Sequence, residues 1–134
     1  MKNKRIFLKR RREKRRIRGF YNKSIYPSVG LFCIKSAETG YLTSKQIESV
    51  RRLISRKTKR LSRVWINKVL DKSLTKKASG SRMGKGKGKV IYKISRVYKG
   101  QIIYEINGIS LNLMRDVFNS IKYKLPLKIV LINN

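Results

Sequence analysis

The chain has 134 residues, which is the size of a single domain that buries about two thirds of its unfolded surface. Its 36 lysines and arginines against six aspartates and glutamates give a formal net charge of +30 at pH 7. A charge of this size repels itself unless a polyanion neutralises it, and nucleic acid is the natural partner. Hydrophobic residues make up 40% of the chain, which excludes a simple disordered basic tail and requires a core.

Cysteine and histidine usage excludes further classes. The chain has no histidine, so neither the usual zinc spacings nor the histidine-dependent catalytic sets are available to it. Its single cysteine, Cys33, has no internal disulfide partner. No apolar stretch approaches the roughly 18 residues that a membrane span needs. We therefore expect no membrane span, no metal site and no cofactor.

Positive charge is densest at the start of the chain. Residues 1–20 contain eleven basic residues and one acid, Glu13. A mitochondrial presequence is the alternative interpretation, but presequences are usually Ser-rich and amphipathic, and this run has no serine and few apolar residues. We interpret residues 1–20 as a basic RNA-embedded arm that precedes a single domain of residues 21–134. The cations expected to bind RNA there are Lys9, Arg10, Arg11, Arg12, Arg15, Arg16 and Arg18.

Residues 29–37 are β-branched and aromatic and predict a buried strand, in which Cys33 is a buried, inert thiol. Residues 44–60 predict a helix, because Thr43 and Gln46 form a capping box before it. The apolar residues that repeat at helical spacing are Ile47, Val50 and Ile54.

Basic residues cover the other faces of this helix. A surface helix can be basic for solubility alone, but acids then usually alternate with the bases, and here only Glu48 does. We interpret the cations as phosphate contacts. Those expected to bind RNA on the helix and just after it are Arg51, Arg52, Arg56, Lys59, Arg60 and Arg63.

The rest of the chain alternates strands with one more helix. Residues 62–70 predict a strand, with Trp65 in the core or at its edge rather than forming a platform for base stacking. Residues 90–98 and 102–106 predict a hairpin, and residues 127–132 predict a last strand. A second helix is expected between the cap Ser110 and Pro126. Its predicted apolar stripe is Leu111, Met114, Phe118, Ile121 and Leu125. Together these elements predict an α+β domain with two helices packed on a mixed sheet.

Residues 82–89 alternate cations with glycines and contain no carboxylate. Glycine permits close backbone approach, and lysine supplies a mobile charge, so this loop is suited to contact with a polyanion. A flexible charged loop in solvent is the alternative. Because no core side chain changes, replacing the three glycines with alanine is expected to leave the fold nearly intact. The loop consists of Arg82, Met83, Gly84, Lys85, Gly86, Lys87, Gly88 and Lys89.

The glycine–lysine run does not fit the motifs of nucleotide-binding enzymes. A Walker loop needs a glycine six residues before its lysine and a serine or threonine directly after it. Neither requirement is met at Lys85, Lys87 or Lys89, and the third-glycine positions of a dinucleotide fingerprint hold Lys89 and Ile91. Six acids also leave little for paired-carboxylate catalysis. We therefore do not expect an enzyme.

A general DNA-compacting or membrane-surface cationic protein is the remaining alternative. Counterion release favours any polyanion, so composition does not exclude it. Binding to a membrane surface needs only a basic amphipathic helix, however, and this chain has an ordered core. The core favours a more specific partner.

Several motifs occur in order along nearly the whole chain. They are residues 42–48 (LTSKQIE) with Arg51 and Arg52, residues 64–66 (VWI), residues 71–72 (DK), residues 82–88 (RMGKGKG), residues 104–105 (YE), Gly108 and residues 124–128 (KLPLK). In this order and spacing the chain resembles the large-subunit ribosomal protein family that bacterial nomenclature numbers sixteen. Residues 71–79 depart from that family's usual pattern, which has a proline-bearing stretch there.

The resemblance implies an α/β-hammerhead fold that binds large-subunit rRNA near the peptidyl transferase centre and the aminoacyl-tRNA site. It also implies that residues 82–89 lie near that centre. The partners it implies are rRNA, tRNA in the aminoacyl-site region and other large-subunit proteins, and we expect no homo-oligomer.

The compartment is inferred from composition. Lysine, isoleucine and asparagine are prominent, and alanine occurs only at Ala37 and Ala78, a bias that matches AT-rich codons. Organellar genomes often have such codons, so we expect a mitochondrial ribosome. The cytoplasm of a bacterium and the plastid stroma are the alternatives.

Overall fold

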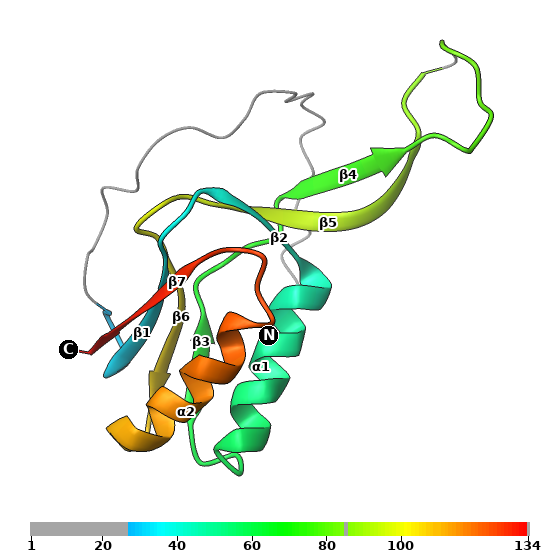
Figure 1. Ribbon diagram of the computed structural model, residues 1–134. Helices are drawn as coiled ribbons and strands as arrows, with labels where there is room; N and C mark the ends of the chain where they lie inside the picture. Colours follow the sequence, from blue (N-terminus) through cyan, green and yellow to red (C-terminus); the bar gives the residue numbers. More distant parts are fainter. Residues whose placement is uncertain (1–26, 85, 134) are drawn as a thin grey trace, which may run out of the picture.

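The structure is a computed structural model that describes residues 27–84 and 86–133. Its elements are β1 (Phe32–Ser36), β2 (Gly40–Thr43), α1 (Ser44–Lys57), β3 (Arg63–Ile66), β4 (Lys72–Lys76), β5 (Lys89–Val97), β6 (Ile102–Asn107), α2 (Leu111–Lys122) and β7 (Ile129–Asn133). The two helices lie side by side against one face of a sheet, while β4 and β5 extend away from this body (Figure 1). The predicted arm and the boundary at residue 20 fall outside the described residues.

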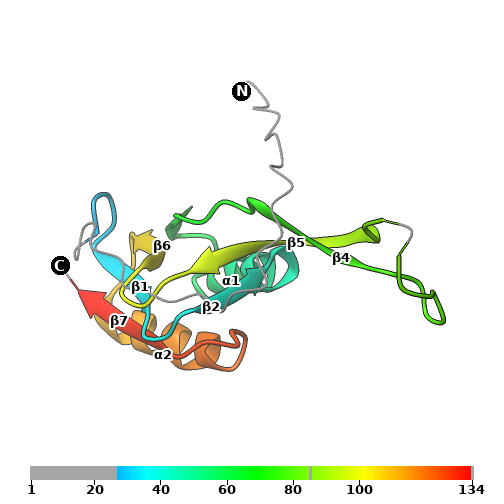
Figure 2. The ribbon, with the colours of Figure 1, turned by 90° about the horizontal axis from the view of Figure 1, so that it is seen from above.

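The strands divide into two sheets. One has the order β3-β6-β1-β7 and the other the order β2-β5-β4, and every strand pair in the described residues is antiparallel. The α+β class is confirmed, but the structure has two antiparallel sheets in place of the one mixed sheet that was expected. In the three-stranded sheet, β5 pairs with β2 at one end and with β4 at the other. Seen from above, β5 and β4 therefore leave the body as a long hairpin (Figure 2).

The hairpin predicted from residues 90–98 and 102–106 is wrong. The chain does turn there, but β5 and β6 belong to different sheets, and β6 pairs with β1 and β3 instead. The end of β1 occupies the turn: the Ser36 N–H donates to the Gln101 carbonyl at 3.0 Å, and the Gly100 N–H donates to the Ser36 carbonyl at 2.8 Å. Strand β1, which is distant in sequence, thus pairs with β6 in the place that the predicted hairpin gave to β5.

Helix α1 begins where its capping box predicts. The Gln46 N–H donates to the Thr43 hydroxyl oxygen at 3.3 Å, and the Thr43 N–H donates to Gln46 Oε1 at 2.9 Å. The helix ends at Lys57 rather than at residue 60, because Lys59 and Arg60 take positive φ values of 50° and 65°. Its buried residues are the three predicted, Ile47, Val50 and Ile54.

Helix α2 begins after Ser110 as predicted, but the Ser110 side chain makes no capping hydrogen bond, and the helix ends at Lys122, four residues before Pro126. Its buried positions are Met114, Val117 and Ile121, so Val117 was missed. Leu111 was assigned to the stripe but is 38% exposed. A period of 3.6 residues explains the difference, because it carries the first residue of a long stripe away from the buried face.

The helices and the four-stranded sheet enclose the core. Tyr104 of β6 is fully buried, and its hydroxyl donates to the Ile47 carbonyl of α1 at 3.0 Å, which ties the sheet to the helix. Cys33 is buried as predicted, and burial raises the pKa of its thiol. Trp65 is half-buried on the edge strand β3, in agreement with a place at the core edge. Neither helix in the described part of the chain has the length and hydropathy of a membrane span.

Candidate nucleic-acid interface

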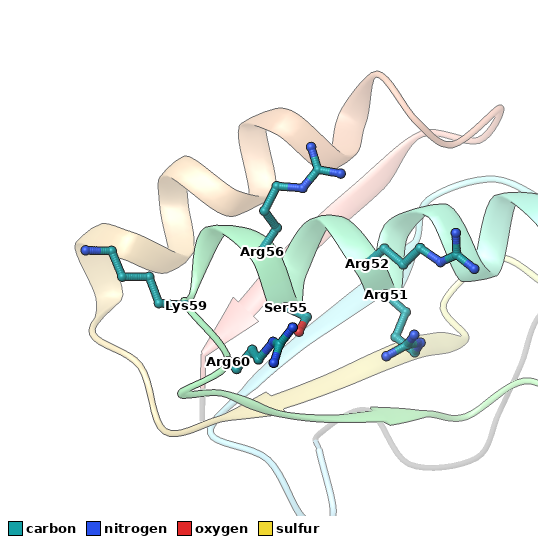
Figure 3. Close-up of a pocket in the computed structure, with 6 residues that line it drawn as sticks. All are labelled: Arg51, Arg52, Ser55, Arg56, Lys59 and Arg60. Atoms are coloured by element: carbon teal, nitrogen blue, oxygen red, sulfur yellow. The ribbon is translucent and has the colours of Figure 1, made fainter.

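Five of the predicted RNA-binding cations meet in one groove along α1. The groove has a volume of about 600 Å³, and its lining is Arg51, Arg52, Ser55, Arg56, Lys59 and Arg60. Figure 3 shows these side chains spread along one side of the helix and past its C-terminal end. Guanidinium groups bind phosphate oxygens through two parallel N–H donors, so this lining is suited to a phosphate backbone. We call these six residues the first α1 groove.

The acid Glu48 holds two of these arginines. Its carboxylate accepts from Arg51 Nη2 at 2.7 Å and Arg51 Nε at 2.8 Å, and from Arg52 Nε at 2.9 Å. Hydrogen bonds from Arg51 and then Arg52 are the largest causes that lower the pKa of Glu48 from 4.5 to about 2. Glu48 is therefore ionised at neutral pH, and it partly occupies two guanidinium groups in the free protein.

The end of the first groove is built on an unusual turn. Lys59 and Arg60 both have the left-handed backbone conformation, which costs a residue with a side chain about 1–2 kcal/mol. Thr58, which is 1% exposed, anchors the turn: its hydroxyl donates to the Ile54 carbonyl at 2.9 Å. The Arg60 N–H donates to the Ser55 carbonyl at 2.9 Å. These contacts carry two cations around the end of the helix and into the groove.

A second cationic groove lies on the other flank of α1. It has a volume of about 500 Å³, and its lining is Lys45, Glu48, Ser49, Arg52, Leu53, Arg56, Lys57 and Lys124. We call this set the second α1 groove. Lys45 and Lys57 lie on α1, and Lys124 comes from the segment that follows α2. Lys57 belongs to the basic helix faces that were interpreted as phosphate contacts, whereas Lys45 and Lys124 were missed. Nothing local indicated that the segment after α2 packs beside α1.

The glycine–lysine loop closes the distal end of the β4–β5 hairpin (Figure 1). A hollow of about 420 Å³ there is lined by Lys76, Lys77, Ala78, Ser81, Gly86, Lys87, Gly88, Lys89 and Ile91. Lys76 and Lys77 were missed as site residues, since β4 is short and polar and was not predicted. The hollow brings their charges beside Lys87 and Lys89 from the predicted loop. Lys85 lies outside the described residues.

The expectation that alanine at the three loop glycines leaves the fold nearly intact is wrong. Gly84 and Gly86 have φ values of 97° and 76°, which strain any residue with a side chain. A Cβ at Gly88 would overlap the backbone carbonyl of Lys76 and come within 2.7 Å of the Lys77 nitrogen. The glycines are therefore required by the backbone of the hairpin, whatever the loop binds.

The predicted cations do not form one continuous site. Arg63 begins β3 and is exposed, but it lines neither α1 groove. Met83 and Arg82 are exposed in the loop that joins β4 to β5. The seven predicted cations of residues 9–18 lie outside the described residues. Among the described residues no cluster of three metal-ligating side chains occurs.

Comparison with known proteins gives a consistent family. A family model described as Ribosomal protein L16p/L10e matches residues 3–132. The chain is 39% identical over 124 residues to the large ribosomal subunit protein uL16c of Emiliania huxleyi, which covers 92% of this chain and 90% of that protein. It is 40% identical over 119 residues to the large ribosomal subunit protein uL16 of Methylibium petroleiphilum, and this match covers 89% of this chain and 86% of that protein.

Proposed function

The chain belongs to the ribosomal protein L16p/L10e family, and from this premise we propose that it binds large-subunit rRNA near the aminoacyl-tRNA site and the peptidyl transferase centre. It is a structural constituent of the large ribosomal subunit and not an enzyme. Its partners are rRNA and other large-subunit proteins.

The single observation that carries the rRNA-binding proposal is the first α1 groove. Five cations line it: Arg51, Arg52 and Arg56 project from a helix whose opposite face is buried in the core, and Lys59 and Arg60 lie on the turn that follows the helix. The helix thus fixes the spacing of the cations before any ligand arrives, which lowers the ordering cost of binding. A net charge of +30 adds attraction for RNA from any direction.

The glycine–lysine loop is the second part of the proposal. The β4–β5 hairpin carries the loop away from the body (Figure 1). Four lysines are among the residues that line the hollow at its distal end. We propose that the α1 grooves fix the domain on rRNA while the loop reaches toward the tRNA-binding region. The motif at residues 82–88 supports this placement through the family resemblance.

The salt dependence of RNA binding tests the first α1 groove. The slope of log K against log salt is negative, and each lost phosphate contact lowers its magnitude by about 0.7 to 0.9. Replacing Arg51, Arg52, Arg56 and Arg60 with glutamine is expected to lower the slope by roughly three units on that scale. The control removes four cations that line neither groove: Lys93, Arg115, Lys122 and Lys128. Equal slopes for the two variants would show that the groove is not the interface.

A general nucleic-acid-compacting protein is the alternative function, since counterion release does not distinguish RNA from DNA. Sedimentation of a cell lysate in a sucrose gradient separates the two. The ribosomal proposal expects comigration with large ribosomal particles that is lost after RNase treatment and kept after DNase treatment. Loss after DNase alone would support the alternative.

The proposed compartment is the mitochondrial ribosome, with a bacterial cytoplasm or a plastid stroma as the alternatives. The low alanine content and the prominence of lysine, isoleucine and asparagine support an AT-rich coding sequence. Locating that coding sequence tests the proposal. A position in mitochondrial DNA is the expected result, and a bacterial chromosome or plastid DNA would replace it with the corresponding alternative.

A further inference from the structure

The two α1 grooves share one ridge. Arg52 and Arg56 line both grooves, whereas every other lining residue belongs to only one of them. At about 100° per residue, positions 51 and 55 fall on one flank of these arginines, and positions 49, 53 and 57 fall on the other. The ridge therefore separates two parallel cationic surfaces.

Each flank has cations of its own. Arg51, Lys59 and Arg60 line only the first groove. Lys45, Lys57 and Lys124 line only the second groove. Glu48 lines the second groove one turn before Arg52, and it accepts hydrogen bonds from Arg52 of the ridge and from Arg51 of the first flank. Both grooves thus present an excess of positive charge to the outside.

We infer that α1 straddles the two strands of an RNA double helix, with one phosphate backbone in each groove and the Arg52–Arg56 ridge between them. This inference rests on the proposed rRNA binding and names the form of RNA that is bound. A single strand has one backbone and can fill only one groove at a time, which leaves three cations without a phosphate.

The dimensions favour a double helix with a wide, shallow groove. An α-helix with its side chains is about 10–12 Å across, so its two flanks lie about that far apart. The minor groove of A-form RNA is wide and shallow, and proteins contact the phosphates and 2′-hydroxyls on both of its sides. Ser55 lines the first groove and Ser49 the second. The Ser49 hydroxyl donates to the Gln46 carbonyl at 2.8 Å, so its oxygen is suited to accept a hydrogen bond from a 2′-hydroxyl.

Two variants separate the flanks. The first changes Lys59 and Arg60 to glutamine, and the second changes Lys45 and Lys124 to glutamine. All four side chains are exposed, and none of them is held by Glu48. A third variant, with Lys93→Gln and Arg115→Gln, removes the same charge outside both grooves. Circular dichroism and melting temperature establish that each full-length variant is folded.

The probes are a 20-base-pair RNA duplex and one of its strands, and the measured quantity is the slope of log K against log salt. On the duplex, each flank variant is expected to lower the slope by about 1.8, and the combined variant by about 3.6, because the flanks bind different backbones. On the single strand, each flank variant is expected to change the slope by less than half of this, because the strand moves to the intact groove. The combined variant is expected to weaken single-strand binding as well.

Two results would overturn the inference and leave the proposed function intact. One is an equal loss on the single strand and the duplex for both flank variants, which would place one strand along the whole helix. The other is a loss on the duplex for only one flank. If no flank variant differs from the Lys93→Gln, Arg115→Gln control on either probe, the α1 interface itself is wrong.

Discussion

The carboxylate of Glu105 accepts a hydrogen bond from the backbone N–H of Val29 at 2.8 Å. The same carboxylate accepts from the N–H groups of Ser28 at 3.1 Å and Gly30 at 3.2 Å, and from the Asn67 amide at 2.5 Å. Glu105 is 2% exposed and lies on β6, in the centre of the four-stranded sheet. One of six acids in a chain of charge +30 is thus used to fix the segment before β1 rather than to balance surface charge.

Replacing Glu105 with glutamine is expected to lower the free energy of unfolding by about 2 kcal/mol or more. Hydrogen bonds to a charged group contribute about 1.5–3 kcal/mol. Glutamine also replaces one acceptor oxygen with an NH2 group, which would face backbone N–H groups that donate as well. Urea denaturation of the full chain measures the change. Glu38→Gln is the matched control, because Glu38 makes an exposed ion pair with Lys128 at 3.3 Å and exposed pairs contribute about 0–1 kcal/mol. Equal effects of the two substitutions would contradict the assigned role.

The contribution of Glu105 is also expected to depend on pH. Burial acts to raise the pKa of this carboxyl, but the hydrogen bonds from Val29, Gly30, Asn67 and Ser28 together lower it below 4.5. A lowered carboxyl pKa means that the stabilisation is complete above the unfolded-state pKa and is lost as the pH falls through the folded-state pKa. The stability difference between the wild type and Glu105→Gln should therefore be constant from pH 7 to 5 and shrink below pH 4.5. A difference that grows on acidification would show that the sign is wrong.

Local sequence patterns predicted the elements whose position depends only on residues close to them in the sequence. The capping box of Thr43 and Gln46 and the repeat of apolar residues placed α1 and its buried face, because both depend only on neighbours in sequence. The groove cations of α1 followed from the same periodicity. Lys59 and Arg60 were placed on the helix, however, because no glycine marks the left-handed turn that ends it.

The parts that were missed depend on distant segments. Residues 90–106 suggest a hairpin, but β1 pairs with β6 and displaces β5 into another sheet. The second α1 groove requires Lys124 to pack beside α1, and the hollow of the loop requires β4, a polar strand without a hydrophobic pattern. The role of Glu105 follows from an approach of residues 28–30 that no local pattern indicates.

Replacing Glu48 with glutamine is expected to tighten RNA binding at low salt and to steepen its salt dependence. The substitution removes a negative charge beside the first α1 groove and releases the Arg51 and Arg52 guanidinium groups. A filter-binding titration of the RNA duplex at several salt concentrations measures both effects. Glu38→Gln makes the same charge change and is the control. Identical salt slopes for the two variants would mean that Arg51 and Arg52 are not phosphate ligands.

Replacing Lys59 with glycine is expected to stabilise the protein and weaken its RNA binding. Lysine is strained at a φ of 50°, and glycine is not. The strain that is removed exceeds the cost of the greater unfolded-state entropy of glycine by a few tenths to about 1 kcal/mol. The melting temperature should therefore rise, while the salt slope falls by about 0.9. Lys57→Gly is the matched control for the melting temperature alone, because Lys57 lies in the last turn of α1 and loses about 1 kcal/mol of helix propensity. Lys57 lines the second α1 groove, so this variant is not a control for RNA binding. A lower melting temperature for Lys59→Gly would show that the turn carries no strain.

In the glycine–lysine loop, Gly88→Ala and Lys87→Gln are expected to act in different ways. Alanine at position 88 overlaps the Lys76 carbonyl, so β4 must move, and the amide resonances of Lys72–Lys76 should shift in the free protein. Glutamine at position 87 removes a charge from an exposed side chain of the hollow and should leave those resonances in place. If the loop reaches the tRNA-binding region, ribosomes that carry Lys87→Gln should assemble fully and accommodate aminoacyl-tRNA more slowly. A normal rate for Lys87→Gln, together with a slow rate for Gly88→Ala, would assign the loop a role through hairpin shape and not through its charge.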